Sequence, residues 1–150
     1  MKSVIISPTT QFNDTMNYWL IKSEPDAYSW SDFERDGVTE WTGVRNYQAR
    51  NNLRAMALGD RALYYHSNIG KELVGIAEVT RTAQQDPTTD NAQWVSVEVR
   101  PKQALPKPVS LAAIKAEPRL ANMGLLRQSQ LSVVALTADE FVCLCEMAGL

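Results

Sequence analysis

The sequence predicts one α+β domain, in which a small barrel-like sheet of about five or six strands is flanked by short helices. Three observations support this fold class. The 150 residues suit a single domain with one continuous core. Short segments with strand-like apolar patterns are interrupted by segments that begin with helix caps. A content of 45% hydrophobic and 21% charged residues is typical of a globular protein and excludes a disordered chain.

Strands are expected where apolar residues alternate with polar ones or run continuously between turn signals. The expected strands are residues 17–22, 61–67, 72–80, 93–100 and 132–136. The third is apolar on both faces and contains Gly75, as a strongly bent strand in a closed sheet requires. Residues 86–91 are expected to form an exposed loop. Three prolines follow the fourth strand, and because proline lacks a backbone donor they predict no regular structure until Ser110.

Helices are expected where a capping residue precedes apolar residues at helical spacing. The expected helical segments are residues 30–36, 47–57, 111–116, 118–123 and 138–148. Ser29 with Asp32, and Thr137 with Glu140, match capping boxes of the first and last helices. Asn46 is suited to cap the second helix, whereas the segment before it, 41–45, is expected to be a loop. Glycines are expected to end three helical segments, at Gly37, Gly59 and Gly124.

The N-terminal residues differ from the rest. Residues 1–15 are rich in Ser, Thr, Pro and Asn and are interpreted as a loose leader before a domain that spans 16–150. They lack the charged start, apolar core and cleavage site of a signal peptide, so a cytoplasmic location is expected. The longest uncharged apolar runs have about five residues, far short of the roughly 20 needed to cross a bilayer, so no membrane partner is predicted.

Metal, cofactor and covalent chemistry have no support in the sequence. His66 is the sole histidine, and Cys143 and Cys145 lie too close along the chain to bond to each other, so neither a structural zinc site nor a disulfide framework is predicted. Nothing resembles a serine-nucleophile elbow, a phosphate-binding loop or a dinucleotide fingerprint. We therefore expect no cofactor, no metal and no enzyme activity.

Basic residues are concentrated in one part of the chain. Residues 41–71 carry five basic side chains against one acidic one, although the whole protein has a formal charge of −2. Arg50 and Arg54 lie one helical turn apart on the face of the second helix opposite Tyr47, Leu53 and Met56, which are expected to pack. Such a patch suits contact with the phosphates of a nucleic acid. The alternative is an ordinary solvated helix face balanced by acidic neighbours.

Aromatic residues gather in the same half of the sequence. Eight tyrosines and tryptophans precede His66: Tyr18, Trp19, Tyr28, Trp30, Trp41, Tyr47, Tyr64 and Tyr65. Aromatic faces stack on nucleobases while nearby arginines reach phosphates. Most of these rings must nevertheless form the core of so small a domain, so two or three are expected to line a pocket. Trp19 and Trp30 are expected in the core, and Trp94 belongs to the expected strand 93–100.

Three segments carry a family resemblance: YWLIKSEP at 18–25, WTGVRNYQARN at 41–51 and YYHS at 64–67. They resemble the hallmark segments of the EVE domain family, relatives of thymocyte nuclear protein, and the resemblance extends over about residues 17–149. It implies a PUA-like fold, a twisted barrel with flanking helices, related to the YTH readers of methylated adenine. It also implies binding of nucleic acid, DNA or RNA, through a modified base, notably modified cytosine in DNA, without catalysis.

The resemblance suggests a site when it is transferred residue by residue. Lys22 and Ser23 match a Lys-Ser pair that follows the first strand in the YTH readers, and Trp41 matches the tryptophan that forms one wall of their aromatic cage. A flipped base needs such a ring for stacking and amides for its polar edge. The predicted base pocket consists of Lys22, Ser23, Trp41, Gly43, Val44, Arg45, Asn46, His66, Ser129 and Leu131. The predicted phosphate contacts are Arg50 and Arg54. Gly43 is expected to permit close approach of the backbone.

Each assignment has a structural alternative. Trp41 fits the core, Asn46 a simple helix cap, and His66 a hydrogen-bonded structural histidine. Arg45 either contacts phosphate or pairs with Glu40. Two other classes of function stay open as well. One is an enzyme acting on a flipped modified base, a glycosylase or nuclease, for which Glu24 and Asp26 are the carboxylates near the motif loop. The other is a protein-interaction module that uses the aromatic surface.

Overall fold

A computed structural model describes residues 16–150 of the chain, so the expected leader, residues 1–15, lies outside the described residues. The strands are β2 (Tyr18–Ser23), β3 (Thr39–Trp41), β4 (Arg61–His66), β5 (Glu72–Gln85), β6 (Val95–Ser110) and β7 (Val133–Leu136). The helices are α1 (Trp30–Asp36), α2 (Tyr47–Ala55), α3 (Leu111–Ala116), the 3₁₀ turn η2 (Pro118–Leu120), α4 (Gly124–Arg127) and α5 (Ala138–Met147). The predicted α+β class is confirmed.

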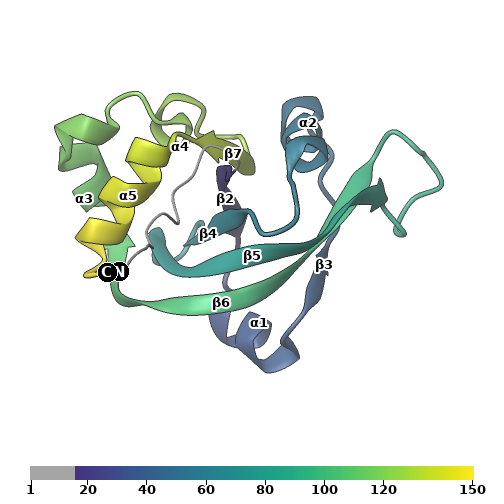
Figure 1. The fold of residues 1–150 in the computed structure, drawn as a ribbon, viewed down its shortest axis with the longest axis horizontal. Coiled ribbons are helices and arrows are strands. Elements are labelled where there is room, and N and C mark those ends of the chain that lie inside the picture. The colour runs from purple at the N-terminus through teal and green to yellow at the C-terminus, as the bar shows by residue number, and fades with distance from the viewer. Residues whose placement is uncertain (1–15) are drawn as a thin grey trace, which may run out of the picture.

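The strands form one mixed six-stranded sheet in the order β3-β6-β5-β4-β2-β7. β2 pairs in parallel with β4, and the other neighbours are antiparallel. Within the described part of the chain the outer strands β3 and β7 do not pair with each other, so the twisted sheet is not closed. Figure 1 shows β5 and β6 as a long curved ribbon, with α3, α4 and α5 together at one end and α1 and α2 on opposite sides of it.

Two strand predictions were wrong. Thr39–Trp41 forms β3 although Trp41 was expected in a loop, because three residues paired to Val97–Val99 are too few to show a period in the sequence. β6 continues to Ser110 through all three prolines. Beyond Val99 it pairs only with β5, so the other edge needs no backbone donor, and register shifts between β5 and β6 accommodate the rest.

The capping predictions for α1 and α5 are confirmed, since both boxes form as expected. α2 ends at Ala55, two residues earlier than expected. Gly124 begins α4 and does not end the preceding turn. A Cβ there would lie 2.6 Å from Cγ1 of Val134, so glycine is needed for close packing against β7. None of the helices in residues 16–150 is long and apolar enough to span a membrane.

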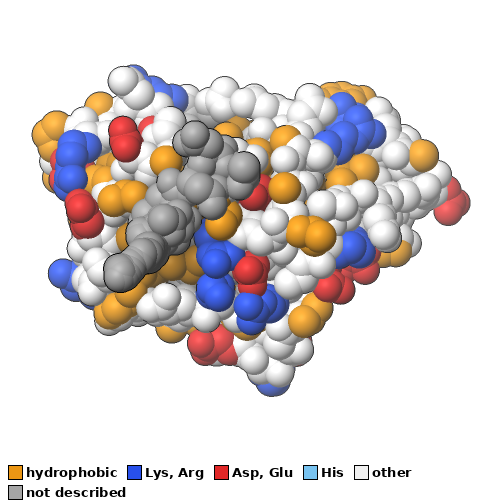
Figure 2. Space-filling view, viewed as in Figure 1, with side chains coloured by type: hydrophobic (Ala, Val, Ile, Leu, Met, Phe, Trp, Pro, Cys, Tyr) orange, Lys and Arg blue, Asp and Glu red, His pale blue; other side chains and the backbone are white. Residues whose placement is uncertain are grey.

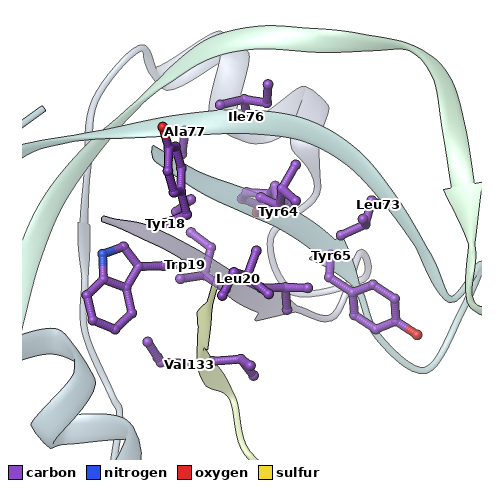
Figure 3. Close-up of a cluster of buried hydrophobic side chains, with 14 of the residues drawn as sticks. Tyr18, Trp19, Leu20, Tyr64, Tyr65, Leu73, Ile76, Ala77 and Val133 are labelled. Carbon is purple, nitrogen blue, oxygen red and sulfur yellow. The ribbon is translucent and has the colours of Figure 1, made fainter. Parts of the chain in front are cut away.

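The core lies between the sheet and the helices (Figure 3). Side chains of β2, β4, β5 and β7 meet there, and Leu20 and Tyr64 are completely buried. The predictions that Trp19 and Trp30 belong to the core are confirmed. The Trp30 ring covers Gly75, where an added Cβ would lie 2.4 Å from ring carbons. Gly75 therefore makes room for an indole and also lies at a shift of the β5–β6 register.

Candidate nucleic-acid interface

A cleft of about 1130 Å³ opens where the ends of β2, β3 and β4 meet the loop before α2. Predicted pocket residues that line it are Lys22, Ser23, Trp41, Gly43, Val44, Arg45, Asn46 and Ser129. Lining residues that were not predicted include Tyr28, Thr39, Glu40, Tyr65, Ser67, Asn68, Lys71, Gln130 and Ser132. Segments more than 100 positions apart in sequence thus form one wall, as in the 2.7 Å hydrogen bond from Lys22 Nζ to the Ser129 carbonyl.

Two predicted pocket residues lie elsewhere. His66 does not line the cleft, because successive side chains of β4 point to opposite faces and the lining residues are its neighbours Tyr65 and Ser67. Its Nε2 accepts a 3.0 Å hydrogen bond from the Trp30 backbone N–H at the start of α1. Burial lowers the pKa of His66, which favours the neutral ring that this bond requires. Leu131 does not line the cleft either: it is buried in the core, whereas its neighbours Gln130 and Ser132 line the cleft.

Trp41 forms the aromatic wall of the cleft. Its ring meets Tyr28 at 6.5 Å and Tyr64 at 5.7 Å, with interplanar angles of 68° and 80°. Both contacts are edge-to-face, and no ring among the described residues stacks parallel to Trp41. Of the eight tyrosines and tryptophans before His66, the three that line the cleft are Tyr28, Trp41 and Tyr65, which agrees with the expected number.

The edge of the cleft beside Trp41 is fixed by hydrogen bonds to one carbonyl. Ser23 Oγ and Tyr64 Oη both donate to the Tyr28 backbone oxygen, each at 2.7 Å. Tyr28 Oη in turn donates to Asp36 at 2.8 Å. Lys22, the residue before Ser23, also lines the cleft, and burial lowers the pKa of its ammonium group. The walls are therefore held in place before any ligand arrives.

Asp86 holds the loop before α2, and sequence reasoning missed it. The residue was expected in an exposed loop, but its side chain is fully buried. Oδ2 accepts from the Gly43 N–H at 2.8 Å and from Arg45 at 3.0 Å, while Oδ1 accepts from the N–H and Oγ1 of Thr88. Burial would raise the pKa of Asp86, but these hydrogen bonds outweigh it and lower the pKa. The sequence signal was the turn Asp-Pro-Thr, in which aspartate commonly bonds the N–H two residues on.

Of the two roles considered for Arg45, the ion pair with Glu40 does not form. Its guanidinium pairs with Asp86 and donates to Thr88 Oγ1 at 3.0 Å. Glu40 instead accepts from Ser96 Oγ at 2.8 Å. Gly43 has a φ of 82°, and a Cβ there would meet nothing within 4 Å, so glycine is required by the backbone conformation and not by lack of space.

Asn46 combines the two roles considered for it. Its Oδ1 accepts a 2.9 Å bond from the Ala49 N–H and caps α2, while the residue also lines the cleft. Because the oxygen is committed to the helix, the side-chain NH₂ is the part of Asn46 that can serve a ligand as a donor.

The two arginines of α2 have neutral partners. Arg50 donates to Asn51 Oδ1 and to the Gln93 carbonyl, and Arg54 donates to the same carbonyl at 3.4 Å. Neither pairs with a carboxylate within residues 16–150. Figure 2 shows basic side chains gathered on the side where Figure 1 places α2. The alternative of a patch balanced by direct acidic partners is therefore not observed for these two residues.

Two aromatic predictions near this patch were wrong. Tyr47 was expected on the packed face of α2 but is 58% exposed, whereas Leu53 and Met56 are buried. Trp94 was expected within a strand but lies half-buried just before β6, stacked on Tyr47. The rings pack on each other at the surface because Tyr47 is the first residue of α2, beyond the part of the helix that covers the sheet.

Acidic residues of the cleft differ from those proposed for an enzyme. Glu24 lines it as expected, Asp26 does not, and Glu40 is an addition. Within residues 16–150 there is no group of three or more His, Cys, Asp or Glu side chains placed to hold a metal ion.

A twisted mixed sheet with peripheral helices and a cleft at the ends of its strands defines a PUA-like α+β domain. The chain belongs to the EVE domain family, whose profile matches residues 17–147. The resemblance seen in the sequence is thus confirmed. Thymocyte nuclear protein 1 of Gallus gallus is 35% identical over 161 residues, which cover 85% of this chain and 66% of that protein. The chain therefore spans just under two thirds of the length of this relative.

Solved structures of relatives have the same fold. The protein Atu2648 from Agrobacterium tumefaciens is 47% identical, with a TM-score of 0.88 over 89% of this chain and 94% of that one. Human THYN1, solved in complex with 5-methylcytosine containing DNA, is 31% identical, with a TM-score of 0.83 over 88% of this chain and 97% of that one. A YTH domain from Zygosaccharomyces rouxii, in complex with N6-methyladenosine RNA, has a TM-score of 0.59 at 16% identity, a likeness of fold alone.

Proposed function

We propose that this protein is a non-catalytic reader that binds a modified nucleobase, modified cytosine in DNA, in the cleft beside Trp41. The observation that carries the proposal is the ring of Trp41, which lines the cleft with no parallel aromatic partner among the described residues. A base removed from its stack needs such a face. The human relative in complex with 5-methylcytosine containing DNA supports the choice of ligand.

Other cleft residues have complementary roles in this proposal. The NH₂ of Asn46 and the hydroxyl of Ser23 supply polar contacts for the edge of the base, and Lys22 supplies positive charge close to it. Asp86 acts through the loop, because its hydrogen bonds position Gly43 and Arg45. Arg50 and Arg54 contact phosphates outside the cleft, since neither has a carboxylate partner in the described chain.

The test is a titration of the protein with 5-methyl-2′-deoxycytidine and with short DNA containing it, followed by tryptophan fluorescence. Trp41→Ala should weaken binding of both by roughly ten- to a hundredfold, because stacking on an aromatic ring contributes about 1–3 kcal/mol per base. Trp41→Phe keeps a ring and should lose less. Both variants should keep the fold, since Trp41 is partly exposed at an outer strand.

Three results would count against the reader. Equal affinity for methylated and unmodified cytosine would remove the modified base as ligand. Unchanged binding by folded Trp41→Ala would remove the ring from the site. Release of the base or cleavage of the strand during incubation with excess protein, abolished by Glu24→Gln, would establish the alternative of an enzyme with Glu24 as its carboxylate.

A further inference from the structure

Tyr47 and Trp94 form an exposed ring pair outside the cleft. Their centroids are 5.1 Å apart with an interplanar angle of 29°, and Tyr47 is 58% exposed. The Arg50 guanidinium carbon lies 5.1 Å from the Tyr47 centroid and 5.9 Å from that of Trp94. The Arg45 guanidinium carbon lies 5.7 Å from Trp94 on the side of the cleft. Two rings and two guanidinium groups thus form one cluster.

The cluster is not part of the core. Leu53 of the same helix is completely buried, whereas Tyr47 exposes more than half of its surface. The neighbours of Tyr47 in the cluster are nevertheless held in place by hydrogen bonds. The backbone of Trp94 is hydrogen-bonded to the backbones of Asp86 and Asn91, and the Arg50 side chain donates to Gln93 and Asn51. A large aromatic ring held in one orientation at the surface loses little conformational entropy when a flat ligand stacks on it.

The cluster is also continuous with the cleft. Arg45 lines the cleft and contacts Trp94, and Tyr47 directly follows the cleft residue Asn46. Arg50 and Arg54, one turn and two turns along α2, both reach the Gln93 carbonyl next to Trp94. Positive charge therefore lies against both rings, and Arg45 connects the ring pair to the cleft.

We propose that the Tyr47–Trp94 pair is a second nucleotide subsite, which stacks a nucleobase adjacent in the strand to the base held in the cleft. Arg50 and Arg54 contact the phosphates of that segment. Rings next to arginines bind successive bases of a single strand with little dependence on base identity. The subsite rests on the proposed function and adds to it, because it makes the ligand a short stretch of strand and not one base.

The test separates this subsite from the cleft. Three probes are compared by fluorescence titration: the 5-methyl-2′-deoxycytidine nucleoside, a single-stranded DNA pentamer with a central 5-methylcytosine, and the same pentamer with abasic neighbours. The parent protein should bind the intact pentamer about tenfold or more tightly than the abasic one. Tyr47→Ala should abolish that difference and leave the nucleoside affinity unchanged. Tyr47→Phe, the matched control, should preserve it.

The outcomes distinguish the two proposals. If folded Tyr47→Ala binds the intact pentamer as tightly as the parent, or if abasic neighbours cost the parent nothing, the subsite is refuted while nucleoside binding still supports the cleft. If the parent binds no methylated nucleoside or pentamer, the proposed function itself fails, and with it the subsite. Because Tyr47 is mostly exposed, Tyr47→Ala should unfold with the same urea midpoint as Tyr47→Phe, which confirms that both variants are folded.

Discussion

Asp86 concentrates several interactions of the cleft in one side chain. Asp86→Asn keeps its size, but an amide has one acceptor oxygen where the carboxylate has two, so the contacts to Gly43, Arg45 and Thr88 cannot all survive. We expect a loss of roughly 2–4 kcal/mol in the free energy of unfolding, measured with urea. Binding of the methylated nucleoside should weaken too, because the loop that carries Gly43 loses its anchor.

Asp90→Asn is the matched control for Asp86→Asn, since Asp90 belongs to the same loop and is exposed. It should change stability by less than about 0.5 kcal/mol. If the two variants behave alike, Asp86 does not hold the cleft in the way its hydrogen bonds indicate.

At the scale of elements, the short helix α2 links the cleft at its N-terminal cap to the two arginines along its length. Ala49 and Leu53 are buried and attach it to the sheet, while its cap lies at the cleft and Arg50 and Arg54 face away from the core. The helix therefore sets the distance between the proposed base site and the charges proposed to meet the strand.

Replacing Arg50 and Arg54 together by Gln should weaken binding of single-stranded DNA and flatten its salt dependence. Each lost phosphate contact lowers the slope of log K against log salt by about 0.7 for a single strand, so the expected change is about 1.4. Nucleoside affinity should stay the same. The measurement is a set of titrations between low and physiological salt.

The charge-matched control for that variant is the double replacement of Arg100 and Arg119, which pair with Glu78 and with Glu117 and Glu146. It changes the net charge equally but should leave the salt slope nearly unaltered. Equal slopes for both double variants would mean that overall charge, and not the face of α2, governs binding.

At the scale of the whole molecule, stability should fall in acid in two stages. Burial lowers the pKa of His66 in the folded protein, so below about pH 6.5 the unfolded chain takes up a proton first and stability decreases. Burial would raise the pKa of Asp86 and Glu78, but their hydrogen bonds and ion pairs lower it. Their contribution is therefore present above about pH 4 and lost below it.

Urea unfolding between pH 8 and pH 3 measures both stages. His66→Gln should remove the decrease that begins near pH 6.5 and leave the second stage in place. A first stage that persists in His66→Gln would assign it to another group.

The sequence by itself determined the features that depend on neighbours along the chain. The capping boxes at Ser29 and Thr137 were predicted because they join residues three positions apart. The burial of Trp19 and Trp30 followed from size and apolarity, and the family followed from contiguous motifs. Eight of the ten predicted pocket residues line the cleft, because most of them belong to those motifs.

The tertiary structure alone decided the features that join distant segments. Asp86 reaches Gly43 across 43 positions, and no local pattern identifies that partner. Which side of β4 faces the cleft depends on the register of the sheet, and this placed Tyr65 there and turned His66 toward α1. Tyr47 and Trp94 meet only because α2 crosses the end of the β5–β6 ribbon. Pairing of this kind is set by long-range packing, so sequence patterns within one element do not contain it.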